Sequence, residues 1–267
     1  MRAIPTTMDA QIVAAVDDRL RVVADTEKVV IPWAIESGSR AWGFPSPDSD
    51  YDCRFFFVRR RTDYLSPWPR RDVIETPLDK IFDVNGWDVI KAVRLLVKGN
   101  ATVTEWLRSP IVYSGDEAFR DGFLTLAGSL FDPVKAARHY RHVGLQQKGT
   151  ASEALALKRV FYALRPAATL HWLRVNPDAG VPPMDLPSLV EQADPGPELR
   201  TRIADLVELK STTREIGAGE VPSVILDFIE RELELAAPFD ELDPTVNTDR
   251  IALAEEWFLT ALDTWGG

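Results

Sequence analysis

The sequence predicts an α+β protein, in which an α/β domain with a mixed sheet precedes an all-helical domain. Over the first half of the chain, short apolar runs typical of buried strands alternate with amphipathic helical patterns. From about residue 114 onward, apolar side chains recur only at helical spacing. Prolines and capping residues divide that second half into segments of helix length. We therefore expect two domains, at 1–125 and 126–267.

Five elements are expected in the first half. In chain order they are a helix at 9–28, strands at 29–36, 50–58 and 81–84, and a helix at 88–98. Asp9 is a suitable N-cap for the first helix, because its side chain can accept from the free amides of the first turn. Three consecutive phenylalanines mark 50–58 as a buried strand. Gly99 is suited to end the last helix of the group.

Six helices are expected in the second half. They lie at about 116–130, 133–148, 153–174, 198–216, 222–236 and 249–264. Pro166 falls inside the third of them and is expected to kink or split it, since proline removes an intrahelical hydrogen bond. The proline-rich segment 176–197 is expected to be an ordered surface loop.

Composition excludes several classes of protein. At 267 residues, with 45% hydrophobic and 27% charged residues, the chain has the make-up of a soluble globular protein. No apolar run approaches the ~18 residues of a membrane span, and the start lacks the apolar segment of a signal peptide, so we expect a cytoplasmic protein without a membrane partner. A single cysteine, Cys53, excludes a disulfide framework, and three histidines leave little room for a His-rich metal centre.

The net charge of −10 argues against a protein that wraps nucleic acid with its whole surface. A local basic surface is still present, because residues 54–71 hold six arginines and one acid, Asp63. This segment is either a solvated loop or a basic rim for a polyanionic substrate.

Two carboxylates in the segment 36–52 point to chemistry. Asp50 and Asp52 are two residues apart on an expected strand, so both face the same side while Tyr51 and Cys53 face the core. Carboxylates held this close repel each other unless a cation lies between them. Oxygen ligands of this kind suit Mg²⁺, which commonly uses one or two protein carboxylates together with substrate phosphates.

Gly38 and Ser39 lie where the strand at 29–36 ends. A glycine at this place allows the backbone to approach a phosphate closely, and Ser39 offers a hydroxyl and an N–H. Neither Gly-Ser nor Asp-x-Asp is specific by itself. Together, at the spacing G-S-x10-D-x-D with a strand on each side, they resemble the signature of the DNA polymerase β-like nucleotidyltransferase superfamily.

Further blocks resemble one branch of that superfamily, the RlaP-type predicted nucleotidyltransferases found near RNA-repair ligases. The blocks lie at 36–43, 49–54, 83–92, 95–100, 105–113 and 158–166. The resemblance implies a polymerase β-like catalytic domain followed by a helical domain. It also implies transfer of an NMP from an NTP, ATP among the candidates, to an acceptor hydroxyl with release of pyrophosphate.

In such enzymes two divalent cations, Mg²⁺ or Mn²⁺, are held by three carboxylates. Asp50 and Asp52 match the family pair. The third carboxylate normally lies on a later strand beside them, and Asp83 best fits that place. Asp88 is an alternative, although it is also suited to cap the following helix, and Glu75 is a weaker one.

Other residues are candidates for binding the nucleotide. The resemblance implies that Gly38 and Ser39 contact the triphosphate, while Arg40 either contacts a phosphate or pairs with Glu36. In relatives of this architecture a basic helix beyond the catalytic domain often closes over the triphosphate. Three residues of the expected helix at 153–174 fit that role or are simply solvated: Lys158, Tyr162 and Arg165.

The resemblance to the repair-associated branch favours an RNA 3′ end as acceptor. The arginine clusters are compatible with RNA binding, and their members are Arg59, Arg60, Arg61, Arg70 and Arg71. Within the enzyme class the rival acceptor is a small molecule or a protein side chain, which the acidic charge suits equally well. From another class, the chain could be a nucleotide-binding regulator or toxin–antitoxin partner with little turnover.

Overall fold

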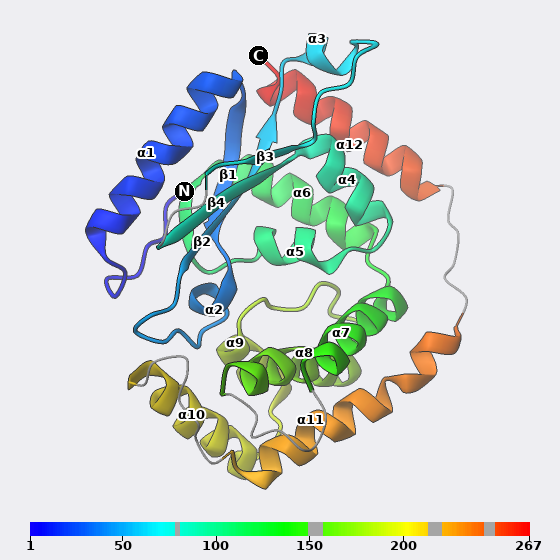
Figure 1. Cartoon of the computed structure of the whole chain (residues 1–267). Coiled ribbons are helices and arrows are strands. Elements are labelled where there is room, and N and C mark those ends of the chain that lie inside the picture. Colours follow the sequence, from blue (N-terminus) through cyan, green and yellow to red (C-terminus); the bar gives the residue numbers. More distant parts are fainter. Residues whose placement is uncertain (78–80, 149–156, 213–220, 243–248) are drawn as a thin grey trace. The chain divides into compact units, whose positions relative to one another are not determined.

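The computed structural model describes residues 1–77, 81–148, 157–212, 221–242 and 249–267 (Figure 1). None of the helices in these ranges is long and apolar enough to cross a membrane. The chain forms two compact units. The sheet unit comprises Met1–Gly38, Asp50–Leu130 and Val246–Gly267, and the helical unit comprises Ser39–Ser49 and Phe131–Thr245.

The sheet unit contains a five-stranded mixed sheet with the strand order β3-β4-β2-β1-β5. Its strands are β1 (Val30–Glu36), β2 (Tyr51–Val58), β3 (Val73–Glu75), β4 (Phe82–Asp88) and β5 (Val112–Gly115). β2 runs parallel to β4 and antiparallel to β1, while β3 and β5 pair antiparallel at the two edges. The parallel pair matters for the site, because parallel strands bring equivalent ends together.

Helices cover both faces of this sheet (Figure 1). They are α1 (Ala10–Glu27), α4 (Val89–Val97), α5 (Ala101–Leu107), α6 (Glu117–Ser129) and α12 (Asp249–Trp265), with the short α3 (Arg61–Tyr64) after β2. Asp9 caps α1 as expected, with its carboxylate accepting from Gln11 N. The buried stripe of α1 packs on Phe55 and Phe57. Phe56 points to the opposite face, where it contacts Trp106, Phe119 and Phe123.

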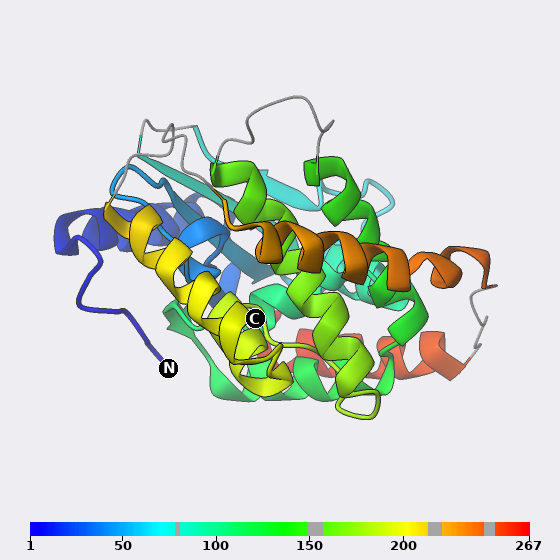
Figure 2. The same ribbon diagram turned by 90° about the horizontal axis from the view of Figure 1, so that it is seen from below.

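The helical unit is built around α8 (Leu157–Val175), against which three other helices pack (Figure 2). Those three are α7 (Pro133–Lys148), α9 (Leu186–Ala193) and α11 (Ser223–Leu235), and α10 (Pro197–Thr212) contacts α11. Pro166 does not split α8, which continues through it. Gly144 of α7 lies beside the proline, and its closest approach is to α11, since a Cβ built on this glycine would lie 2.6 Å from Leu233 Cδ2.

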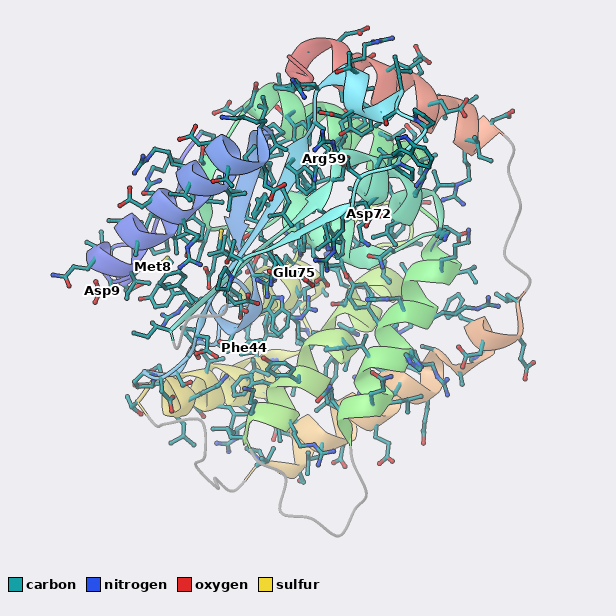
Figure 3. The ribbon with its side chains drawn as sticks, turned by 45° about the horizontal axis from the view of Figure 1, so that its top comes forward. Met8, Asp9, Phe44, Arg59, Asp72 and Glu75 are labelled. Atoms are coloured by element: carbon teal, nitrogen blue, oxygen red, sulfur yellow. The ribbon has the colours of Figure 1, made fainter. Side chains whose placement is uncertain are left out.

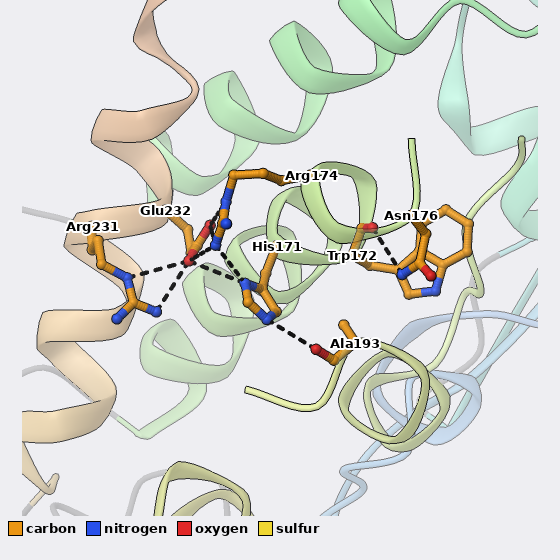
Figure 4. A network of polar contacts seen from close by, with 7 residues as sticks. All are labelled: His171, Trp172, Arg174, Asn176, Ala193, Arg231 and Glu232. Carbon is orange, nitrogen blue, oxygen red and sulfur yellow. Dashed lines mark hydrogen bonds and ion pairs between the residues drawn. The ribbon is translucent and has the colours of Figure 1, made fainter. Parts of the chain in front are cut away.

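A buried carboxylate ties three of these helices together (Figure 4). Glu232 of α11 is 1% exposed and accepts from the guanidiniums of Arg174 on α8 and Arg231 on its own helix. His171 Nδ1 lies 3.2 Å from Glu232 Oε1, and its Nε2 lies 3.2 Å from the carbonyl of Ala193 on α9. Burial raises the pKa of Glu232, but the hydrogen bonds from His171 and Arg174 outweigh it and lower that pKa to about 2.

Most of the expected elements are confirmed, with three classes of difference. Helix α9 lies inside 176–197, where we expected only loop; Asp185 caps it, and Pro187 stands in its first turn, where proline is tolerated. The pattern missed β3, β5 and α5, which are only three, four and seven residues long. Residues 153–156 and 213–216 of two expected helices lie outside the described residues.

The two compact units also differ from the expected ranges 1–125 and 126–267. Helix α12 belongs to the sheet unit, where Trp257 stacks on Phe123 with ring centroids 4.0 Å apart. Residues Ser39–Ser49 belong to the helical unit. Contacts between residues far apart in sequence decide both assignments, and hydropathy patterning does not report such contacts.

Candidate active site

The register of the parallel pair places two carboxylates side by side. Asp52 of β2 and Asp83 of β4 are Cα partners. Their side chains are 31% and 26% exposed, whereas Tyr51 and Cys53 are buried on the other face of β2. The alternation along β2 is therefore as the sequence predicts, and it presents Asp52 beside Asp83 on an accessible face.

A guanidinium lies between the two carboxylates. Arg54 Nη2 donates to Asp52 Oδ1 at 3.1 Å and to Asp83 Oδ2 at 2.9 Å. The second oxygen of Asp83 accepts from Asn85 Nδ2 at 2.7 Å. Two ionised carboxylates that contact the same group repel each other unless that group is positively charged, and Arg54 provides this charge.

Glu36, at the end of β1, fixes the backbone beside Asp52. It is fully buried, and its Oε1 accepts from Asp52 N at 2.8 Å. Its Oε2 accepts from the hydroxyl of Tyr113 at 2.6 Å, and burial together with the charge of Glu36 raises the pKa of Tyr113. This buried network holds the start of β2 in one position.

Gly38 packs against the Asp52 side chain. Its φ is +62°, and a Cβ built on it would lie 2.2 Å from Asp52 Oδ2. The preceding amide, Ser37 N, donates to Asp52 O at 2.8 Å. Only glycine satisfies both the left-handed backbone and the close approach.

Gly38→Ala is therefore expected to displace the Asp52 carboxylate. Because a misplacement of about 1 Å can cost about 10²-fold, we expect nucleotidyl transfer to fall by about that factor. The control is Gly128→Ala in helix α6 of the same unit, where a built Cβ meets nothing within 4 Å. Equal transfer rates for both variants and the unmodified protein would refute this role for Gly38.

The donors at this position are carboxylate oxygens, which suit a hard divalent cation, and a bound cation would take over the charge compensation that Arg54 supplies here. Asp50 precedes β2 and is exposed. Within the described part of the chain, no three His, Cys, Asp or Glu side chains are grouped closely enough to hold a metal ion. The structure thus pairs Asp52 with Asp83 and does not gather Asp50 into the same group.

The alternatives for the third carboxylate lie elsewhere. Asp88 is the partner of Phe57, five residues along β4 from Asp83, or about 17 Å. It is buried and caps α4, and burial raises its pKa to about 6. Glu75 lies on β3 and pairs with Arg71. The register therefore favours Asp83.

The loop after Gly38, residues 39–49, is closed by three buried serines. Ser39 Oγ donates to Ser49 Oγ at 2.9 Å, and Ser46 N donates to the same oxygen at 2.9 Å. Arg40 Nη2 donates to the carbonyl of Ser49 at 2.6 Å. Ser39 and Arg40 are thus fixed within the loop. We call residues 39–49 the motif loop.

Helix α8 brings the three predicted nucleotide-binding residues to the motif loop. Arg165 lies over the ring of Trp42, with its Cζ 4.4 Å from the ring centroid. Tyr162 meets Trp42 edge to face at 5.2 Å, and Lys158 Nζ lies 5.8 Å from the Tyr162 centroid. These cations and rings form one cluster inside the helical unit.

Sequence reasoning missed Lys210 of α10. Its side chain is 1% exposed, and its ammonium lies 4.8 Å from the centroid of Phe44 and 5.2 Å from that of Phe161. A signal was available, because the buried stripe of α10 runs through Leu199, Ile203 and Leu206 and then reaches Lys210 at the next helical position. A lysine in an apolar stripe marks a buried cation.

The predicted RNA-binding arginines are not equivalent. Arg59 is buried and pairs with Asp88 and Glu27, at the same end of the sheet unit as Asp72 (Figure 3). It is therefore not part of an exposed basic surface. The other four are exposed, each paired with a carboxylate: Arg60, Arg61, Arg70 and Arg71.

Comparison with known proteins agrees with this geometry. Residues 12–260 match the model of the family described as RlaP: RNA repair pathway DNA polymerase beta family. The chain belongs to the RlaP family. It is also similar to the uncharacterized protein YcgL of Bacillus subtilis (strain 168), with 36% identity over 219 residues that cover 81% of this chain and 84% of that protein.

RlaP membership confirms the family predicted from the motifs, and a polymerase β family member is expected to be a nucleotidyltransferase. The motifs alone did not indicate the two residues that hold the carboxylates in place. Both lie inside the matching blocks, since Arg54 ends the block 49–54 and Glu36 begins the block 36–43, but the blocks did not reveal what they do. A charged residue next to one of two acids on neighbouring strands can indicate that it holds those acids in place.

Proposed function

We propose that the protein is a metal-dependent nucleotidyltransferase that moves an NMP from an NTP to the 3′ end of an RNA. The observation that carries this proposal is the pairing of Asp52 and Asp83 in register on adjacent parallel strands, with one cationic group between them. A protein that only bound nucleotides would not need carboxylates arranged in this way. Family membership supports the same class of reaction.

In this proposal Asp52 and Asp83 would hold Mg²⁺ or Mn²⁺, two ions in all, and the exposed Asp50 would have to turn toward this pair to complete the set. When bound, the ions lower the pKa of the acceptor hydroxyl and screen the triphosphate charge. The acceptor hydroxyl gives its proton to solvent, and its oxygen forms a bond to the α-phosphorus. The bond between the α-phosphorus and the oxygen that bridges to the β-phosphorus breaks, and this oxygen leaves as part of pyrophosphate. Asp52 and Asp83 are kept in place for this step by Glu36, Arg54 and their own strands.

The resemblance to the superfamily assigns triphosphate binding in this proposal to six residues, which are Gly38, Ser39, Arg40, Lys158, Tyr162 and Arg165. The serine hydroxyl is engaged within the loop, so Ser39 contributes its N–H. Lys210 supplies an additional buried positive charge behind the loop.

RNA is favoured as acceptor by the family description and by the four exposed arginines after β2. The rival acceptor, a small molecule or a protein side chain, is favoured by the net charge of −10. A regulator with little turnover is disfavoured, because Asp83 lies beside Asp52 rather than away from it.

Label transfer from each α-³²P-NTP tests the proposal. The reactions contain Mg²⁺ or Mn²⁺, are run with and without RNA, and use Asp50→Ala/Asp52→Ala as the control. Label on RNA that disappears in the control is the expected result. Label on protein would instead establish transfer to side chains. NTP binding without label in any fraction would contradict the proposed transfer to RNA.

A further inference from the structure

An exposed tryptophan lies in the basic segment after β2. The loop that follows α3, residues 65–72, carries Trp68 with 82% of its surface exposed. Tryptophan is usually well buried, and a large exposed ring flanked by charges commonly marks an interaction surface. We call residues 65–72 the Trp68 loop; it follows the short helix α3 in Figure 1.

The charges around this loop suit a phosphate backbone. Arg70 and Arg71 lie within it, and Arg60 and Arg61 precede it. Their carboxylate partners do not prevent such binding, because exposed ion pairs are weak and can exchange for phosphate oxygens. An aromatic ring among arginines is the arrangement that single-stranded nucleic acids use, with a base on the ring and phosphates on the guanidiniums.

A cavity of about 410 Å³ lies beneath the loop. Its lining includes both hydrogen-bond donors and acceptors: Arg59, Arg70, Arg71, Asp63, Asp72 and Asp88. Arg59 is 5% exposed, and its Nε makes no hydrogen bond among the described residues but lies 3.5 Å from Asp88 Oδ2 in an ion pair. Guanidiniums fit a phosphate, and carboxylates can accept from ribose hydroxyls, so the cavity suits a ribonucleotide better than a deoxyribonucleotide.

The distance between the cavity and the Asp52–Asp83 pair sets a minimum length for an RNA that reaches both. Arg59 lies seven residues beyond Asp52 along the direction of β2, which corresponds to about 23 Å. A stacked strand advances about 3.4 Å per nucleotide, and it must pass around the helices that cover the sheet, so at least about seven nucleotides separate the two places. A strand whose 3′ end lies at the carboxylates therefore reaches the Trp68 loop only if it is longer than about six nucleotides.

We propose that the Trp68 loop and the cavity beneath it bind single-stranded RNA at least about seven nucleotides upstream of the reacting 3′ end. This inference rests on the proposed transfer to RNA. One base stacks on Trp68, and the neighbouring phosphates contact Arg70 and Arg71. The surface makes a long RNA a better acceptor than a short one.

Binding of 16-nucleotide and 4-nucleotide fluorescent RNAs tests the inference. Anisotropy is measured with the full chain carrying Asp52→Asn, without NTP, so that no transfer occurs. In this background Trp68→Ala is expected to weaken binding of the 16-mer about 10-fold, while Trp68→Phe restores it to within about twofold. The 4-mer is expected to bind much more weakly than the 16-mer.

Charge is tested by Arg71→Ala against Arg21→Ala. The two arginines are 67% and 68% exposed, and each pairs with an acid three or four residues away in the sequence, but Arg21 lies on α1. Only Arg71→Ala should lower the slope of log Kd against log salt, by about one. Equal effects of the two variants would overturn the inference, as would normal 16-mer binding by Trp68→Ala or equal affinity for DNA of the same sequence.

The experiments can refute the RNA-binding surface and the proposed transferase function independently of each other. Trp68-dependent RNA binding without label transfer would refute the proposed transfer. Label transfer to RNA, with Trp68→Ala binding the 16-mer normally, would refute the Trp68 surface and leave the transferase.

Discussion

Asp52→Asn is expected to abolish nucleotidyl transfer, with a loss of at least about 10³-fold. The amide keeps the shape of the side chain but removes the negative charge that a divalent cation requires, and loss of such stabilisation is worth about 4 kcal/mol in the transition state. The rate of label transfer from an NTP measures the effect. Binding of Mn²⁺, followed by its paramagnetic resonance, is expected to weaken in the same variant.

Matched variants separate this effect from a general loss of charge. Asp18→Asn removes an exposed carboxylate of α1 that also pairs with an arginine, and it should transfer normally. Asp83→Asn should lose as much activity as Asp52→Asn, while Asp88→Asn should lose far less. If Asp88→Asn is the more damaging of the last two, the third carboxylate is Asp88.

Glu232→Gln is expected to lower the free energy of unfolding by about 2–3 kcal/mol. The carboxylate is buried, and the amide retains its volume but not the charge that pairs with Arg174 and Arg231. The loss of stability is smaller than for fully buried guanidiniums, because both are about half exposed and can be solvated by water. Urea unfolding measures the change, with Glu234→Gln, exposed on the same helix, as the control.

The same carboxylate gives the stability a defined pH dependence. The pKa of Glu232 is about 2 in the folded protein, against an ordinary value of 4.5, so the folded state favours the ionised form. Its contribution is fully present above about pH 4.5 and is lost as the pH falls towards 2. Unfolding measured between pH 5 and 2 should show a shallower decline for Glu232→Gln than for the unmodified protein. Parallel curves would contradict the assignment.

Sequence reasoning predicted the elements that carry a periodic pattern and the residues that lie in a motif. The alternation of Tyr51, Asp52 and Cys53 placed one carboxylate on the open face and its neighbours in the core. Asp83 was predicted by resemblance, and the register of β2 with β4 now places it beside Asp52. Its role as a metal ligand remains a prediction.

Residues whose importance depends on long-range contact were not predicted. Arg54 acts through a partner 29 positions away, and Glu36 through one 77 positions away. Arg59 belongs by sequence to a basic cluster, yet burial against Asp88 removes it from the surface. Charge and hydropathy along the chain describe neighbours in sequence, whereas these roles are set by pairing between strands.

The division of the chain between the two units has a consequence for its synthesis. Helix α12 completes the sheet unit through contacts of Trp257 with Phe123 and of Phe258 with Tyr64, yet it is made after the whole helical unit. Domains usually fold in the order in which they leave the ribosome. Here the sides of α4 and α6 that α12 covers stay exposed until residues 249–265 emerge. The sheet unit is therefore incomplete for about half of the time that the chain takes to be translated.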